Sequence, residues 1–265
     1  MTYRVGFIQN QPVFGDIEAN RNRITALAED LEADLLVLPE LFTTGYQFTS
    51  REEARGLAET VPGPTAEFLS ALSKKKNLFI IAGLAELDGE AVYNSSVVTG
   101  PQGFIGRYRK IHLFDTEKTI FDAGDQPPPV FELGAARVGV MICFDWRFPE
   151  TARSLALKNA DVIAHPSNLV LPHCPQSMIT RCLENRVYAI TADRVGAEQR
   201  IAGETLTFIG QSQVVDPDGN VLVRASVDKE GSAVVEIDLE KARKKSINPV
   251  NDLFGDRRTD LYHLS

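Results

Sequence analysis

Short apolar runs alternate with amphipathic helical segments along the whole chain, and no linker or low-complexity segment separates them. Leu35–Leu38 is apolar at every position, which predicts a central strand covered on both faces. The helix expected after Asp16 carries its apolar residues at i, i+3, i+4 and i+7, namely Ile24, Leu27, Ala28 and Leu31. Strands and helices mixed in this way predict a layered α/β domain whose sheets are covered on at least one face.

The remaining elements are expected from the same patterns. Further helices are predicted at Pro64–Lys76, Pro149–Ala160 and Gln176–Tyr188. Strands are predicted at Val5–Gln9, Leu78–Leu84 and Val162–His165. Two hairpins are predicted to pair Tyr93–Thr99 with Phe104–Tyr108, and Val130–Leu133 with Arg137–Ile142. The last third adds strands near Ala189–Asp193, Gly210–Val215, Val221–Ala225 and Ala233–Ile237.

Size and charge narrow the class of protein. At 265 residues the chain fits one domain, residues 1–265, and its net charge of −8 argues against nucleic acid as a partner. No apolar stretch approaches the ~20 residues that cross a bilayer, so no membrane partner is expected. The first strand begins close to Met1, which predicts that no signal peptide is present. Three cysteines without paired spacing indicate reduced thiols and a cytoplasmic location.

Cys143 ends the apolar run Val138–Cys143, and Pro149 then opens a helical pattern. A thiol at the end of a strand, before a turn, stands clear of the sheet while the next backbone N–H groups point near it. This position favours a nucleophile. The alternative is a buried small hydrophobe, which is the more common role of an arbitrary cysteine.

Two other strands also end in groups that can do chemistry. Glu40 follows Leu35–Leu38 between apolar neighbours, where partial desolvation raises the pKa of a carboxyl toward the range useful for proton transfer. Lys110 follows Phe104–Tyr108 and can supply a positive charge for a developing oxyanion, with Glu117 as its partner. Read singly, Glu40 fits a carboxylate at a helix N-terminus, and the other two fit surface charges.

Together, a glutamate, a lysine and a cysteine after three different strands resemble the Glu-Lys-Cys set of the nitrilase superfamily of carbon–nitrogen hydrolases. Four blocks occur in the family's order and span nearly the whole chain: PELFTTGY around Glu40, YRKIHLF around Lys110, CFDWRFPE around Cys143 and RCLENRVY at Arg181–Tyr188. The resemblance implies a four-layer αββα sandwich of two stacked mixed β-sheets. It also implies a homodimer or larger homo-oligomer.

The C-terminal segment, residues 241–265, is highly charged but carries apolar groups that a solvated tail would not need, namely Ile247, Val250, Leu253, Phe254 and Tyr262. Such a segment is expected to dock. It can fold onto its own domain or reach a neighbouring subunit, and the resemblance favours the neighbouring subunit.

The resemblance implies hydrolysis of a non-peptide carbon–nitrogen bond of a small amide, without a cofactor, releasing ammonia and a carboxylic acid. Cys143 would form a thioester, Glu40 would move the protons, and Lys110 with the backbone N–H of Phe144 would hold the oxyanion. Glu117 would orient Lys110 or the substrate. Nitrile hydrolysis and N-carbamoyl amine hydrolysis fit the same residues. A non-catalytic nitrilase-like binding protein is a further alternative.

Residues that adjoin these segments predict a pocket with an apolar wall: Tyr46, Phe114, Trp146, His165 and Asn168. Arg147 fits either an ion pair with its acidic neighbours, which is favoured, or a contact to a substrate carboxylate. Cys174 beside His173 lacks further ligands at zinc-like spacing, so no metal site is expected, and Cys182 is interpreted as packing. A Cys-His hydrolase using His112 or His165 is the competing enzyme class, although the known local signatures are missing.

Overall fold

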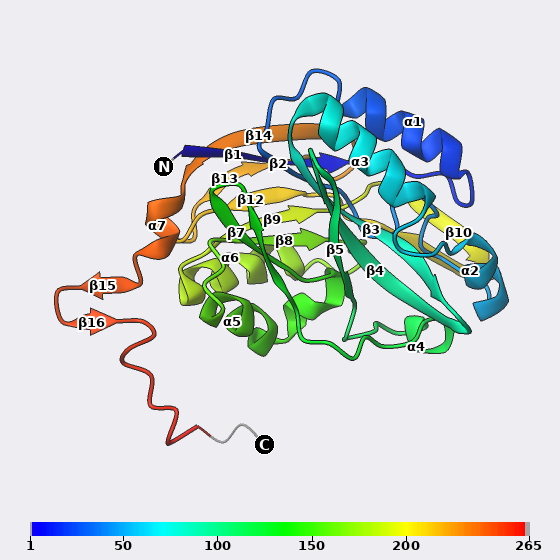
Figure 1. The fold of residues 1–265 in the computed structure, drawn as a ribbon. Helices are drawn as coiled ribbons and strands as arrows, with labels where there is room; N and C mark the ends of the chain where they lie inside the picture. Colours follow the sequence, from blue (N-terminus) through cyan, green and yellow to red (C-terminus); the bar gives the residue numbers. More distant parts are fainter. Residues whose placement is uncertain (1, 263–265) are drawn as a thin grey trace.

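The computed structural model describes residues 2–262, in which two six-stranded sheets stack with helices on both outer faces (Figure 1). The first sheet has the order β14 (Gly231–Asp238), β1 (Thr2–Gln9), β2 (Leu35–Val37), β3 (Phe79–Asp88), β4 (Ala91–Gly100), β5 (Gly103–Arg109). The second has the order β13 (Val221–Arg224), β12 (Gln213–Val215), β9 (Tyr188–Ala192), β8 (Val162–Pro166), β7 (Ala136–Val140), β6 (Val130–Leu133). The predicted four-layer αββα sandwich is confirmed.

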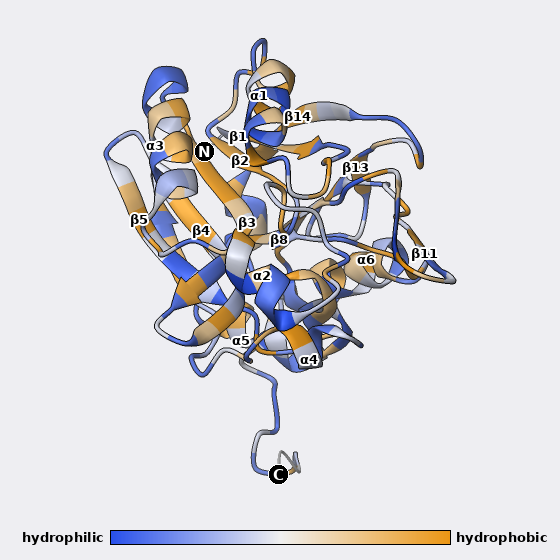
Figure 2. Cartoon of the chain, turned by 90° about the vertical axis from the view of Figure 1, so that its right-hand side faces the viewer, coloured by the Kyte–Doolittle hydropathy of each residue, from blue (hydrophilic) through white to orange (hydrophobic). Residues whose placement is uncertain are grey.

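Helices α1 (Ile17–Leu27) and α3 (Pro64–Lys76) cover the first sheet, and α5 (Pro149–Leu157) and α6 (Cys174–Asn185) cover the second (Figure 1). The shorter elements lie at the ends of the sheets. They are α2 (Arg51–Leu57), α4 (Glu117–Ile120), the 3₁₀ helix Cys143–Arg147, the hairpin of β10 (Ala197–Ile201) and β11 (Glu204–Thr207), and α7 (Leu239–Arg243). In Figure 2 strand β3 is largely hydrophobic, whereas helix α2 is largely hydrophilic.

Strand β2 shows how the sequence builds the layers. Leu35 and Val37 belong to the core between the two sheets, while Leu36 and Leu38 belong to the core between the first sheet and its helices. Side chains alternate between the two faces of a strand, so a strand with apolar layers on both sides is apolar at every position. The prediction that Leu35–Leu38 is central and covered on both faces is confirmed.

Both sheets are mixed, and their parallel strands determine where the site forms. Strands β1, β2 and β3 run parallel, as do β7, β8 and β9, while the flanking strands pair antiparallel. The carboxyl ends of neighbouring parallel strands meet at one edge of a sheet, where functional side chains gather in open α/β folds. The segments after β2 and β7 carry Glu40 and Cys143 at these edges.

The observed elements differ from the predicted ones mainly at their ends. Helix α5 stops at Leu157, and Asn159 adopts a left-handed conformation two residues later. Helix α6 begins at Cys174 and ends at Asn185, with Arg186 in the left-handed C-cap position. The β10–β11 hairpin was not predicted, because its mixed polar sequence lacks a regular apolar alternation.

The C-terminal segment leaves the body of the domain after α7. It forms the hairpin of β15 (Ser246–Asn248) and β16 (Asn251–Asp252), which lies beside the sandwich in Figure 1. Phe254 packs against the main core, whereas Ile247 and Val250 are 63% and 84% exposed. Docking on a neighbouring subunit stays a prediction. None of the helices in residues 2–262 is both long and apolar enough to span a membrane.

Candidate active site

Glu40 lies three residues beyond β2 and is fully buried. The loop that carries it runs along β3: Gly83 N donates to Pro39 O at 3.1 Å, and Phe42 N donates to Gly83 O at 3.1 Å. A Cβ at Gly83 would lie 2.5 Å from Glu40 Cα, so this close approach requires glycine. Backbone contacts therefore fix Glu40 before any side chain does.

Lys110 follows β5 and is also fully buried. Its backbone N donates to Asn94 O at 2.9 Å, and its Nζ lies 2.8 Å from Glu40 Oε1 and 2.7 Å from Glu117 Oε1. Asn94 Nδ2 donates to the same oxygen of Glu40 at 2.6 Å. The other oxygen, Glu40 Oε2, is buried with no hydrogen-bond partner among the described residues, so it can accept a proton.

Glu117 begins α4 and brings the second carboxylate to the lysine. Its Oε1 accepts from Tyr46 OH at 2.8 Å, and its Oε2 accepts from Phe114 N at 2.9 Å. Tyr46 is fixed in turn, since its backbone N donates to Glu198 Oε2 at 3.1 Å. Glu117 therefore has both oxygens engaged and acts as a fixed counterion for Lys110.

Cys143 starts the 3₁₀ helix after β7 with φ at 38°, a left-handed conformation that residues other than glycine rarely adopt. Such strain is typical of residues at functional sites. His165 Nε2 donates to Cys143 O at 2.8 Å, and the Cys143 thiol donates to Asn168 O at 3.7 Å. Phe144 is the second residue of this turn, where helix N–H groups have no intrahelical partner.

Asp145 connects the cysteine segment to the lysine segment and is fully buried. Its Oδ2 accepts from Ile142 N at 2.8 Å and from Tyr108 OH at 2.9 Å. Its Oδ1 lies 2.7 Å from His112 Nδ1. Tyr108 and His112 flank Lys110 in the chain, and Ile142 precedes Cys143, so one carboxylate holds the two reactive segments together.

Burial raises the pKa of Glu40 to about 7, because Lys110 only partly compensates and Glu117 adds a like charge. Burial disfavours the charge of Lys110, yet Glu117 and Glu40 outweigh this and raise the pKa of the lysine above its usual range. Burial raises the pKa of the Cys143 thiol well above its usual range, and Glu40 adds to this while Lys110 opposes it. The lysine is therefore charged, the thiol is neutral, and Glu40 is ready to exchange a proton near neutral pH.

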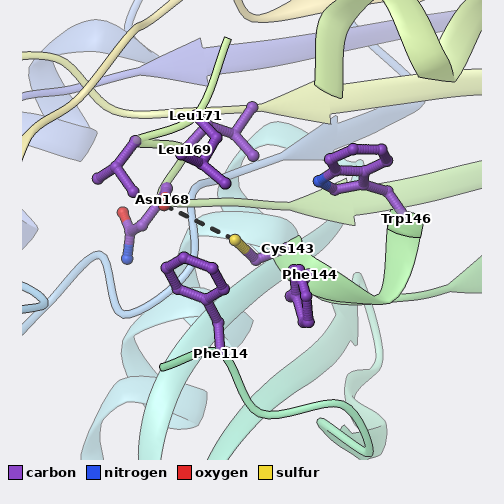
Figure 3. Close-up of a pocket in the computed structure, with 8 residues that line it drawn as sticks. Phe114, Cys143, Phe144, Trp146, Asn168, Leu169 and Leu171 are labelled. Atoms are coloured by element: carbon purple, nitrogen blue, oxygen red, sulfur yellow. Dashed lines mark hydrogen bonds between the residues drawn. The ribbon is translucent and has the colours of Figure 1, made fainter. Parts of the chain in front are cut away.

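A small pocket opens over the sulfur of Cys143 (Figure 3). Its lining consists of Phe114, Cys143, Phe144, Trp146, Asn168, Leu169, Val170 and Leu171. Three of the five residues expected here, Phe114, Trp146 and Asn168, are among them. Tyr46 and His165 are not; Tyr46 contacts Glu117, and the fully buried His165 contacts the backbone of Cys143.

Neither His165 nor His112 is placed to act as a base for Cys143, as a Cys-His hydrolase would require. Burial lowers the pKa of His165 to about 4, and its Nδ1 faces the Thr191 hydroxyl at 3.2 Å rather than the thiol. His112 is engaged with Asp145. Cys174 and Cys182 are fully buried within or at the start of α6. Within residues 2–262, no cluster of three or more His, Cys, Asp or Glu side chains is placed to hold a metal ion.

Sequence reasoning missed Asn94 and the linking role of Asp145. Asn94 begins a buried polar run, Asn94-Ser95-Ser96, within β4. Buried polar groups in a strand need hydrogen-bond partners, so this polar run could have predicted that a polar site contacts β4. The favoured ion pair of Arg147 with its acidic neighbours, Asp145 and Glu150, is not found among the described residues. The Arg147 guanidinium instead lies 5.4 Å from the centroid of the Trp146 ring.

Comparison with known proteins gives consistent relatives. The carbon–nitrogen hydrolase model matches residues 4–245. A nitrilase from Pyrococcus abyssi is 50% identical, covering 98% of this chain and 98% of its own, and an (R)-stereoselective amidase from a Pseudomonas species is 35% identical, covering 91% and 84%. The solved structure of an amidase from Nesterenkonia sp. has a TM-score of 0.80 at 26% identity, covering 98% and 94%. A mutant of that amidase is described with acrylamide added to its active-site cysteine.

Proposed function

The chain belongs to the carbon–nitrogen hydrolase family, and we propose that it hydrolyses a small amide through a thioester on Cys143, releasing ammonia and a carboxylic acid. One observation carries the proposal. The buried Lys110 is held between Glu40 and Glu117, and it is close enough to the Cys143 thiol, on its strained turn, to oppose the rise in the pKa of that thiol. A base, a fixed cation and a nucleophile are the groups that acyl transfer requires.

The first half of the reaction forms the thioester. Glu40 takes the proton of the Cys143 thiol as the sulfur attacks the amide carbon, and the carbonyl electron pair moves to oxygen. Lys110 and the backbone N–H of Phe144 stabilise the oxyanion. Glu40 then gives its proton to the amide nitrogen, the carbon–nitrogen bond breaks, and ammonia leaves.

The second half regenerates the enzyme. Glu40 takes a proton from water while the water oxygen attacks the thioester carbon. The carbon–sulfur bond then breaks, the acid is released, and the proton on Glu40 returns to the sulfur. A pKa of about 7 suits a group that must act alternately as base and acid at neutral pH. Glu117 keeps Lys110 charged and in place throughout.

Nitrile hydrolysis is the second candidate, supported by the 50% identical relative from Pyrococcus abyssi, which is a nitrilase. Attack of the same thiolate on a nitrile carbon gives a thioimidate, whose nitrogen takes its protons from Glu40. Hydrolysis of the carbon–nitrogen bond in that intermediate leaves the same thioester. The two substrates therefore use the same residues and differ in one added step.

The test is an ammonia-release screen across short aliphatic amides, the matched nitriles and N-carbamoyl amines. Cys143→Ala serves as the blank, and Cys174→Ala serves as a matched control because Cys174 lies outside the proposed chemistry. Release by the wild type and by Cys174→Ala, with none from Cys143→Ala, supports the proposal. The proposal fails if a folded wild-type protein releases no ammonia from the amides, or if Cys143→Ala keeps full activity; release from the nitriles alone would favour the second candidate.

The C-terminal segment and the cysteines bear on how the protein assembles and where it is located. We propose a homodimer or larger assembly in which residues 241–265 dock on a neighbouring copy, supported by the exposure of Ile247 and Val250. Exposed apolar side chains on a chain segment favour burial at an interface. Light scattering of the intact protein and of a variant ending at residue 245 tests this. The same number of subunits in both proteins would contradict it.

The three unpaired cysteines support a reducing, cytoplasmic environment.

A further inference from the structure

The pocket beside Cys143 has a mostly apolar lining. Six of the eight lining residues are apolar side chains, and among the described residues that line the pocket none carries a formal charge. Figure 3 shows the sulfur of Cys143 between the rings of Phe114 and Phe144 and the segment from Asn168 to Leu171. A substrate group entering beside the sulfur therefore meets an apolar wall.

Three charged groups near the pocket are already engaged. Lys110 Nζ is within 2.8 Å of two carboxylates. Arg181 Nε donates to Trp146 O at 3.2 Å, and its NH1 lies 3.0 Å from a Glu184 oxygen. Asp145 is occupied by hydrogen bonds on both oxygens. None of these groups can pair with a charge on the substrate without losing a partner of its own.

The polar lining residue Asn168 is also committed. Its Nδ2 donates to Glu40 O at 2.9 Å, and its backbone carbonyl accepts from the thiol of Cys143. The pocket is also narrow, since the rings of Phe114 and Phe144 lie 5.0 Å apart between centroids. Leu171, which is 44% exposed, marks the side open to solvent.

We propose that the acyl group of the substrate is short and uncharged within about four atoms of the reacting carbon, and that amides with a carboxylate or ammonium in this range are excluded. This inference rests on the proposed hydrolysis and adds its substrate class. A charge on such a tail leaves water without gaining a partner, which is unfavourable, whereas an alkyl tail gains from burial.

Two pairs of substrates with matched shape test the charge alone. Pentanamide is compared with 4-aminobutanamide, in which an ammonium replaces the terminal methyl. The second comparison is of 4-methylpentanamide with succinamate, in which a carboxylate replaces the branched methyl end. The wild-type protein should hydrolyse the neutral member of each pair with a kcat/KM at least on the order of 100-fold higher. Values within tenfold of each other in either pair overturn the inference.

The wall can be tested by adding a charge to it. Leu171→Arg should raise the succinamate to 4-methylpentanamide ratio of kcat/KM at least about tenfold over Leu171→Met, which keeps size without charge. Equal ratios in the two variants would show that the acyl tail does not contact this wall.

Arg147→Ala should leave the wild-type ratio unchanged, and loss of succinamate hydrolysis would assign a carboxylate site to Arg147 instead. A charged member hydrolysed with a kcat/KM within tenfold of its neutral partner refutes only this inference. No hydrolysis of any of the four amides, or of propionamide as a smaller neutral reference, refutes the proposed amide hydrolysis itself.

Discussion

Replacing Glu40 by glutamine should lower activity and at the same time remove a cost of burying a carboxylate. Glutamine keeps the size and one acceptor oxygen for Lys110 and Asn94, but it cannot exchange a proton. The loss of a general acid–base group should reduce kcat by about 10²- to 10⁴-fold. The stability change depends on pH, which separates it from ordinary packing effects.

The magnitude follows from the pKa. Folding raises the pKa of Glu40 from 4.5 to about 7. The folded protein therefore favours the protonated over the ionised carboxyl by about 3 kcal/mol more than the unfolded chain does. Between these values the folded state holds a proton that the unfolded state has released, so wild-type stability falls as pH rises from 4.5 to 7. The variant lacks this dependence. Its free energy of unfolding relative to wild type should therefore increase by about 2 kcal/mol between pH 5 and pH 8.

Urea unfolding of both proteins at pH 5 and pH 8 measures this double difference. Effects that do not depend on Glu40 protonation, such as a poorly paired glutamine amide, cancel between the two pH values. Glu29→Gln, at an exposed carboxylate just beyond α1, is the control and should show a double difference near zero. A difference near zero for Glu40→Gln as well, or one of opposite sign, would refute the raised pKa and the acid–base role built on it.

Three further changes test the geometry. Lys110→Ala leaves two buried carboxylates without their cation, so kcat should fall at least about 100-fold; more than a tenth of wild-type turnover contradicts the oxyanion role. Gly83→Ala places a Cβ 2.5 Å from Glu40 Cα, so kcat should fall about tenfold or more in steady-state assays, while Gly56→Ala, which meets nothing within 4 Å, should be silent. Asp145→Asn weakens the tie between the lysine and cysteine segments and should cost about 1–3 kcal/mol in urea unfolding, with an unchanged midpoint contradicting it.

The elements that carry the reactive residues were predictable because each has a local signal. Leu35–Leu38 is apolar at every position, and Cys143 ends a similar run, so strand ends and the residues after them could be located from periodicity alone. Whether those strand ends meet depends on sheet order, which periodicity does not encode. The family resemblance supplied that information, and the strand order places β2 and β7 in different sheets.

The surroundings of the reactive residues were less predictable because they depend on contacts between distant segments. Tyr46 was expected in the pocket, but its hydroxyl reaches Glu117, 71 positions later, and His165 was expected there but holds the backbone of Cys143. Both lie close to the reactive residues, as adjacency in the sequence suggested. Backbone turns, such as the left-handed conformation of Cys143, decide which side chain faces the cavity. Residue types alone do not predict such turns.

Counting the charges of the buried cluster explains how a thiol with a raised pKa can act as a nucleophile. Two carboxylates and one ammonium give Glu40, Glu117 and Lys110 a net charge of −1, so a free thiolate beside them would bring the buried total to −2. That total is unfavourable in a desolvated site, which is why burial and Glu40 both raise the pKa of Cys143. Transfer of the proton from the thiol to Glu40 moves charge from oxygen to sulfur and leaves the total at −1. The same carboxylate that opposes the resting thiolate therefore makes its transient formation possible, and the thiol remains protonated until a substrate is present to receive the sulfur.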